Sequence, residues 1–306
     1  MRLLIFMMIL IGWKGLIAQS KPDSLRKHVV KLCAYPTSRS MVHPVYLTKA
    51  GGYIEKNFRS YSSRVQLQKY VFREDTVFNV MASFGPEDAP RLIIGAHYNV
   101  SEGVPGADGN ASGVSCLIEL ARLLQRHQGN LEIRIDLVAF TLGGLEWAKL
   151  NFSGSNQFAK SLIEDSVSVL GMLNLDAVGF YSDAPGSQHY PMAHYAWMHG
   201  RRGNFLALIL WPGTGLFPRV MRGLLMQYTT GLRVVKFKPI VPFEGFTDGD
   251  HMNFIQYKIP AMLLTNTRGF RNKYFNHDLD TYETLDYFRL SKTTDMLYRA
   301  LIRYRP

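Results

Sequence analysis

Cysteine is almost absent from this chain of 306 residues, which contains only Cys33 and Cys116. Neither residue belongs to a spacing typical of cysteine metal sites, so zinc-finger motifs are excluded. A disulfide between the two is open in an oxidising compartment, although nothing local fixes such a pair. The sequence therefore indicates no cysteine-based site.

Several common catalytic and nucleotide-binding motifs are also missing. The sequence contains no G-x-S-x-G nucleophile elbow, so a serine hydrolase is unsupported. It contains neither a Walker loop nor a dinucleotide-binding fingerprint, the glycine-rich motifs that bind phosphate groups. Serine-nucleophile and nucleotide-dependent enzymes are therefore not indicated.

The apolar run at the start of the chain is too short to span a bilayer. Residues 3–12 follow Arg2, and Lys14 interrupts the run well before the roughly 20 residues that a span requires. Ala18, a small residue before Gln19, suits a cleavage site. We therefore predict a signal peptide at residues 1–18, export to the periplasm or outside the cell, and no stable membrane insertion after cleavage. An amino-terminal membrane anchor is the alternative.

The remaining residues, 19–306, are predicted to form a single α/β domain. An apolar content of 47% in a chain of this length is enough for a sizeable core. The net charge of +11 would favour anionic partners, but the lysine and arginine residues are scattered along the sequence. Nucleic acid is therefore not predicted as a partner.

The stretch 91–124 reads as a buried strand, a glycine-rich loop and an amphipathic helix. An apolar run precedes His97, glycine and proline break regular structure after it, and apolar residues then recur at helical spacing. In an open α/β sheet, ligands bind beyond the carboxyl ends of the strands. The unit therefore predicts a site at His97.

Other polar residues follow predicted strands elsewhere in the chain. Strands are predicted at 62–72, 76–84, 92–96, 133–140, 169–178, 205–210, 234–237 and 261–265, antiparallel at first and then parallel by crossover. Candidate functional side chains at or beyond strand ends are His97, Asp176, Asp250, His251 and His277. Histidines and carboxylates gathered at one sheet edge can form a hydrolytic metal centre.

From about residue 80 to residue 301 the chain resembles the co-catalytic zinc aminopeptidases of metallopeptidase family 28, whose relatives include glutaminyl cyclases. The matching segments are GAHYN at 95–99, GADGNASG at 106–113, AFTLGGLEW at 139–147, LDAVGFYSDAPGSQHYP at 175–191, DHMNF at 250–254 and FRNKYFNHDLDTYETLDY at 270–287. The resemblance implies a three-layer α/β/α fold with a twisted mixed sheet, like that of zinc exopeptidases.

The family pattern also implies which residues would hold zinc, and here the chain departs from it. His97 and Asp176 match two ligands, whereas the bridging acid, the glutamate pair and the final histidine fall on Gly109, Gly143, Gly144 and Asn276. Asp108 and His277 each lie one residue from a missing ligand. Neighbouring residues that would orient ligands are Asn99, Asp250 and His251.

Glycine offers no side chain to coordinate zinc or to accept a proton. Glu146, two residues beyond the missing glutamates, is the nearest acid that could replace them. We therefore expect a catalytically inactive aminopeptidase homologue, with no zinc or only weakly bound zinc, whose cleft binds a peptide or envelope component. The alternatives are a single-metal aminopeptidase that uses His97, Asp176, Asp108 and His277, and a glutaminyl cyclase.

Overall fold

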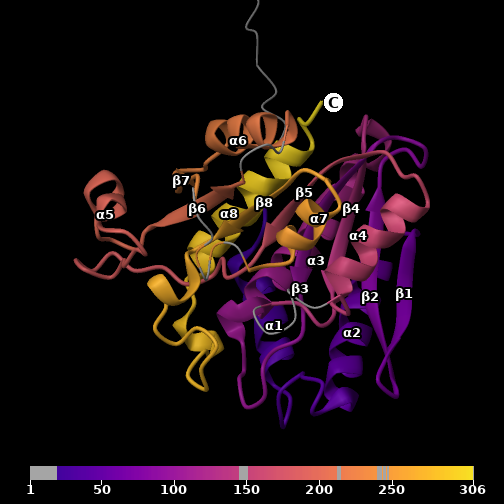
Figure 1. The fold of residues 1–306 in the computed structure, drawn as a ribbon, viewed down its shortest axis with the longest axis horizontal. Helices are drawn as coiled ribbons and strands as arrows, with labels where there is room; N and C mark the ends of the chain where they lie inside the picture. The colour runs from indigo at the N-terminus through magenta and orange to yellow at the C-terminus, as the bar shows by residue number, and fades with distance from the viewer. Residues whose placement is uncertain are drawn as a thin grey trace, which may run out of the picture.

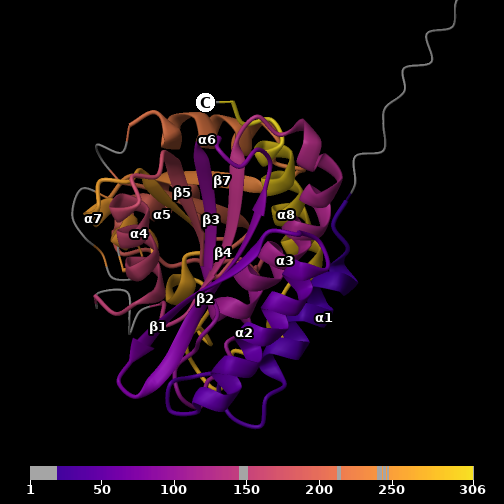
Figure 2. The same ribbon diagram turned by 90° about the vertical axis from the view of Figure 1, so that its right-hand side faces the viewer.

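The computed structural model describes residues 19–144, 151–211, 215–239, 243, 246 and 248–305. The predicted signal peptide at 1–18 and Glu146 lie outside these residues. The described residues form one eight-stranded sheet covered by helices on both faces (Figures 1 and 2). The expected three-layer α/β/α architecture with a mixed sheet is confirmed.

The strand order is β1-β2-β4-β3-β5-β8-β6-β7. The strands are β1 (Val65–Phe72), β2 (Asp75–Phe84), β3 (Arg91–His97), β4 (Arg134–Phe140), β5 (Val169–Leu175), β6 (Phe205–Leu210), β7 (Arg233–Phe237) and β8 (Ala261–Thr265). Strands β4, β3, β5 and β8 pair in parallel, so their carboxyl ends share one edge of the sheet.

Antiparallel pairing flanks this parallel centre on both sides. Strand β2 pairs with β1 in antiparallel fashion, as the sequence predicted, and is also antiparallel to β4. Strand β6 is also antiparallel to β8, and β7 runs parallel to β6. The expectation of antiparallel pairing on one side alone was wrong, because the direction of a strand depends on its connection and not on its own apolar pattern.

Helices cover the two faces of the sheet unequally. The first face packs against α1 (Pro22–Cys33), α2 (Pro44–Arg59), α3 (Ser112–Leu124), α6 (Phe217–Gln227) and α8 (Tyr287–Leu301). The second face packs against α4 (Gly154–Glu164) and α7 (His251–Gln256), while α5 (Ala193–His199) lies beside β6 and β7 (Figure 1). None of the helices in the described ranges is long and apolar enough to cross a membrane.

The central strands are buried on both faces, which explains their continuous apolar runs. Every residue of β4 is buried, and so is every residue of β3 except Arg91. On the first face α3 contributes the largest continuous buried surface, with its apolar residues facing α1 and α8. The sheet and α3 therefore fix the loops that leave the carboxyl ends of the strands.

A buried histidine joins the first two helices of the domain. His28 of α1 is 6% exposed, and its Nδ1 lies 2.7 Å from the hydroxyl of Tyr53 on α2. Burial lowers the pKa of His28 from 6.5 to about 4, although Glu119 opposes this shift. The folded state therefore favours the neutral imidazole.

We expect this histidine to make the domain sensitive to mild acid. The contribution of neutral His28 is fully present above pH 6.5 and is lost as the pH falls toward 4, because the unfolded chain takes up the proton first. Between pH 7.5 and pH 5 the native free energy of unfolding should fall by about 2 kcal/mol more than that of His28→Gln. Urea titration measures this difference. The exposed His277→Gln should behave like the native chain, and an equal loss in His28→Gln would contradict the assignment.

Candidate functional site

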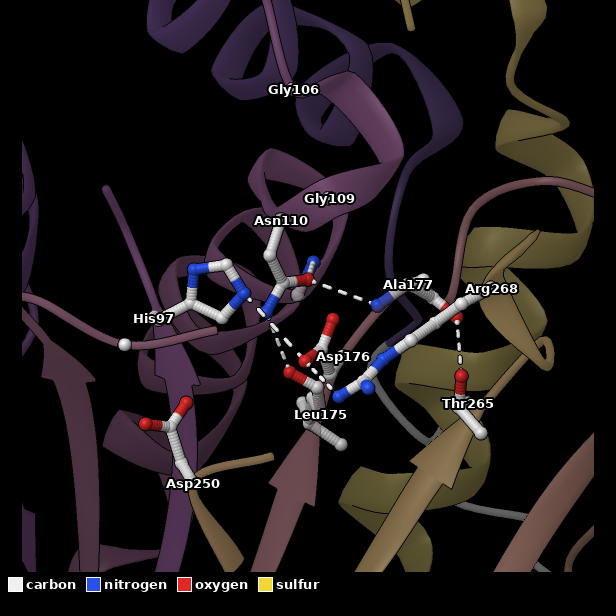
Figure 3. Close-up of polar contacts among 12 residues, drawn as sticks. His97, Gly106, Gly109, Asn110, Leu175, Asp176, Ala177, Asp250, Thr265 and Arg268 are labelled. Carbon is white, nitrogen blue, oxygen red and sulfur yellow. Dashed lines mark hydrogen bonds and ion pairs between the residues drawn. The ribbon is translucent and has the colours of Figure 1, made fainter. Parts of the chain in front are cut away.

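The candidate site lies where three parallel strands end side by side. His97 is the last residue of β3, Asp176 follows the last residue of β5, and Arg268 comes three residues after β8. Figure 3 shows the three side chains converging at this edge, with Asp250 on the other side of His97. Parallel pairing of β3, β5 and β8 brings His97 together with Asp176, 79 positions later, and with Arg268, a further 92 positions along the chain.

Arg268 places a permanent positive charge against Asp176. Its Nη2 lies 2.5 Å from Asp176 Oδ2, and its Nη1 lies 2.6 Å from Asp248 Oδ1. Arg268 and Asp176 are each only 1% exposed. Burial by itself would raise the pKa of Asp176, but Arg268 and His97 together hold that pKa well below its usual range. Asp176 is therefore an ionised carboxylate whose counterion is a guanidinium group.

The backbone at Arg268 is shaped to turn this side chain inward. Thr267 and Arg268 both adopt left-handed conformations, with φ values of 78° and 50°. Such a conformation costs roughly 1–2 kcal/mol for each non-glycine residue. The two ion pairs and the hydrogen bond from Arg268 N to Asn266 Oδ1 offset this cost. The arginine is thus held at a defined position.

His97 is surrounded by oxygen acceptors on both ring nitrogens. Its Nε2 lies 3.6 Å from Asp176 Oδ2, and its Nδ1 lies 3.0 Å from the carbonyl oxygen of Asn99. Burial lowers the pKa of His97, but Asp176 and Asp250 more than compensate and raise it above its ordinary value. A protonated imidazole donates from both nitrogens and has no lone pair for a metal ion.

Gly143 and Gly144, which follow β4, have no side chains, and His97 occupies the space next to them. A Cβ on Gly143 would lie 2.4 Å from the Cβ of His97 and 2.8 Å from Asp250 Oδ1. Gly144 has a φ of +81°, a conformation that side chains rarely adopt. Asn99 fixes this backbone, because its Oδ1 accepts from Gly143 N at 2.7 Å and its Nδ2 donates to Gly143 O at 2.9 Å.

Asp108 is fully buried, but its carboxylate is used by other groups. It accepts hydrogen bonds from the backbone N–H groups of Gly179 and Phe180 and from the side chains of Asn266 and Asn272. The neighbouring Gly109 faces an aromatic ring, since a Cβ there would lie 2.7 Å from Phe275 Cε2. Asp108 therefore ties loops together and does not complete a ligand set with His97 and Asp176.

His277 and Asn276 are also engaged elsewhere. The side chain of His277 is 67% exposed and pairs with Asp278 at 2.5 Å. Asn276 accepts a hydrogen bond from Ser101 Oγ at 2.9 Å. Within the described ranges, no group of three or more histidine, cysteine, aspartate or glutamate side chains could hold a metal ion. The expected set of His97, Asp176, Asp108 and His277 is therefore not assembled.

Asp250 and His251, at the start of α7, lie beside the site. Asp250 accepts a hydrogen bond from Ser155 Oγ at 2.6 Å, and burial raises its pKa although His97 opposes this shift. Burial lowers the pKa of His251 to about 3, so this imidazole is neutral. Both residues lie near the charges of His97 and Arg268, and their expected orienting role stays a prediction.

The cavity beside His97 is small. It is bounded by His97, Asp176, both glycines of the β4 loop and Phe275, and its volume is about 20 Å³. A cavity of this size holds about one water molecule, whereas ligand pockets usually measure hundreds of cubic ångströms. Among the described residues, the space next to Asp176 thus has about the size of one water molecule.

Three residues of this region were missed from the sequence. Arg268 and Asp248 were not expected, although Arg268 follows a predicted strand at the same sheet edge as His97. Asp280 was also missed; its carboxylate accepts from the backbone N–H groups of Asp108 and Gly109 at 2.9 and 3.0 Å. The position of Arg268 shortly after a predicted strand was the sequence signal that could have identified it.

Comparison with known proteins identifies the family of this chain. Residues 79–203 match the profile of peptidase family M28. The chain is 33% identical over 285 residues to the uncharacterized protein YfbL of Escherichia coli (strain K12), covering 90% of this chain and 86% of YfbL. It is 27% identical over 237 residues to the BOS complex subunit NCLN of Homo sapiens, covering 73% of this chain but only 38% of NCLN.

Solved structures share the fold at lower identity. The LapA aminopeptidase of Legionella pneumophila superposes with a TM-score of 0.72 at 16% identity, covering 92% of this chain and 71% of LapA. The glutaminyl cyclase of Porphyromonas gingivalis gives a TM-score of 0.66 at 20% identity, covering 92% of this chain and 97% of the cyclase. Fold and site position thus define an α/β protein of the zinc-exopeptidase type. The chain belongs to peptidase family M28.

The zinc ions that this family implies do not fit the residues present. Arg268 already neutralises Asp176, both ring nitrogens of His97 face oxygen atoms, and glycine stands where the glutamates would be. A divalent cation beside Asp176 would face the guanidinium charge at close range, which is strongly unfavourable in a buried site. No catalytic step can therefore be derived through a metal here.

We expect Arg268→Ala to expose the role of this internal cation. The change leaves Asp176 buried without its guanidinium partner, which should cost about 3–5 kcal/mol of stability. Millimolar guanidinium or zinc should raise the melting temperature of this variant, because either cation can enter the vacated space beside Asp176. Thermal melts with and without each cation measure the effect.

Arg271→Ala is the matched control. Arg271 is also buried, but it bonds to Gln188 and to the carbonyl of Phe205 and not to a carboxylate. This variant should lose stability without gaining it back from either cation. If zinc stabilised the native chain and Arg268→Ala equally, Arg268 would not occupy the place of a metal ion.

Proposed function

We propose that this chain is an exported, catalytically inactive member of peptidase family M28 that acts by binding a peptide or an envelope component. The guanidinium group of Arg268, 2.5 Å from Asp176, is the single observation that carries the proposal. The guanidinium group provides the positive charge that the buried carboxylates require. Unlike a metal ion, it is not a Lewis acid and cannot coordinate a water molecule.

Two further features support loss of catalysis. Gly143 and Gly144 provide no carboxylate to remove a proton, and general-base assistance is worth about 100 to 10,000-fold in rate. The space that a side chain at Gly143 would need is taken by His97 and Asp250. A relative that is named as a subunit of a complex, NCLN, also supports a binding role for members of this family.

The enzymatic alternatives lack support from the geometry. A single-metal aminopeptidase would need Asp108 and His277 beside Asp176, but Asp108 holds four donors and His277 is exposed. A glutaminyl cyclase would need an acidic ligand at Gly144, whose φ of +81° disfavours any side chain. Zinc, if it binds at all, should therefore bind weakly.

The binding surface that we propose lies outside the small cavity. The cavity admits about one water molecule, so a peptide would lie across its rim and not in a deep pocket. Ser101 and Asn276, which are hydrogen-bonded to each other, stand at this rim. They offer polar groups to a peptide backbone without any participation in chemistry.

Zinc content and hydrolysis test the loss of catalysis directly. After dialysis, elemental analysis should find far less than one zinc ion per chain, because Arg268 already neutralises Asp176 and glycine stands where family ligands would be. Leucyl and glutaminyl amide substrates should show no turnover above background with added zinc, with LapA as the positive control. Chelator-sensitive turnover by the native chain, absent in His97→Ala, would refute inactivity.

The amino terminus of the mature protein tests the proposed export. The exported protein should lack residues 1–18, because Ala18 precedes the predicted cleavage point. Intact mass measurement of the protein from the exported fraction decides this. Replacement of Ala18 by a bulky residue should leave the precursor unprocessed, while the same change at the nearby Gln19 should matter less. Retention of residues 1–18 in a membrane fraction would instead indicate an anchor.

A further inference from the structure

One stretch of the sequence is basic throughout. Between Asp183 and Glu244 the chain has no acidic residue but seven lysine and arginine residues, against a net charge of +11 for the whole chain. Strands β6 and β7 of this stretch form one edge of the sheet with α5 beside them (Figure 1), whereas α6 packs against β5, β8 and α8. We call α5, the exposed Arg201 and Arg202 that follow it, β6 and β7 the basic edge.

The basic edge also carries exposed apolar side chains. Of the twelve large hydrophobic side chains that are exposed in the described part of the chain, Trp197 and Met198 lie on α5, and Met192 is the N-cap residue of that helix. Trp197 is 89% exposed and Met198 is 59% exposed. Grouped apolar side chains on a surface mark an interaction site, whereas scattered ones are ordinary.

Helix α5, which carries Trp197 and Met198, packs against β7. Tyr195 and His199, one helical turn apart, pack edge-on against Phe237 of β7 at ring-centroid distances of 5.0 and 4.9 Å. The carbonyl of His199 accepts from Arg233 Nη2 at 2.7 Å. Trp197, two positions from Tyr195, lies on the opposite side of the helix from this contact, and Met198 lies at its flank, so both side chains remain exposed.

Basic side chains surround this apolar tip. Arg201 and Arg202 follow α5 directly and are exposed, and Arg233 stands beside its carboxyl end. Figure 1 shows α5 projecting from the body of the domain beside β6 and β7. Tryptophan and methionine flanked by arginine suit the boundary between lipid headgroups and acyl chains, where the ring and the thioether are buried and the charges meet anionic headgroups.

We propose that the basic edge docks onto an anionic phospholipid surface, with Trp197 and Met198 inserted at the headgroup level. The occupant is a lipid surface and not a soluble anion, because a soluble anion would leave the apolar tip exposed. The docking is peripheral, and it needs no membrane-spanning helix. The proposal stands independently of the loss of catalysis, since the basic edge contributes no side chain to the His97 cavity.

Vesicle co-sedimentation of the full chain tests the proposal. The native protein should bind vesicles of equal parts phosphatidylcholine and phosphatidylglycerol, and higher salt should weaken binding. Trp197→Ser/Met198→Ser should weaken the partition at least about tenfold, because two apolar side chains are no longer buried. Arg201→Ala should weaken binding to these vesicles but not to pure phosphatidylcholine.

The matched control replaces two equally exposed apolar residues far from this edge. Val45 on α2 and Val71 on β1 are 60% and 68% exposed, and β1 is the opposite edge strand. Val45→Ser/Val71→Ser should bind like the native chain. Any of three results would overturn the proposal: no native binding to anionic vesicles, equal binding by both double variants, or self-association that Trp197→Ser/Met198→Ser abolishes, which would make a second copy the occupant.

Discussion

The buried pair between Arg268 and Asp176 determines the character of this molecule's central site. A carboxylate that is 1% exposed must have a nearby cation, because an isolated charge in the interior costs several kcal/mol. In this chain the cation belongs to the protein itself and arrives on the turn after β8. Once that charge is in place, Asp176 has its counterion and His97 Nε2 lies 3.6 Å from the same carboxylate oxygen. Among the described residues, Asp176 Oδ1, Asp250 Oδ2 and His251 Nδ1 have no hydrogen-bond partner.

The side chains and backbone around the ion pair are closely packed. Gly143 brings its backbone against His97; its N–H donates to Asn99 Oδ1 and its carbonyl accepts from Asn99 Nδ2. Phe275 lies against Gly109 on the other side of the cavity. Small residues and an aromatic ring thereby occupy space that an open metal centre would leave to ligands and water. Charge and packing favour the same closed arrangement.

The sequence was sufficient for the scaffold and for part of the site. Strands at 205–210 and 261–265 have the predicted bounds because uninterrupted apolar runs specify buried strands, and His97 and Asp176 meet because parallel strands end at one edge. Arg268 could not be predicted. An arginine after a strand reads as a surface charge, and its inward direction depends on a left-handed turn and on partners far away in sequence. The antiparallel direction of β6 relative to β8 could not be predicted from the sequence either.

The tight contact between Gly143 and its neighbours constrains how this lineage can change. Any single substitution that adds a side chain there must displace His97 or Asp250, and any single loss of Arg268 strands a buried carboxylate. Each step toward a metal-dependent enzyme is thus less stable than the chain it starts from, although several steps together could be compatible. The packing at Gly143 and the ion pair of Arg268 thus make single substitutions at this site destabilising, and only combined changes leave both the cavity and the charges accommodated.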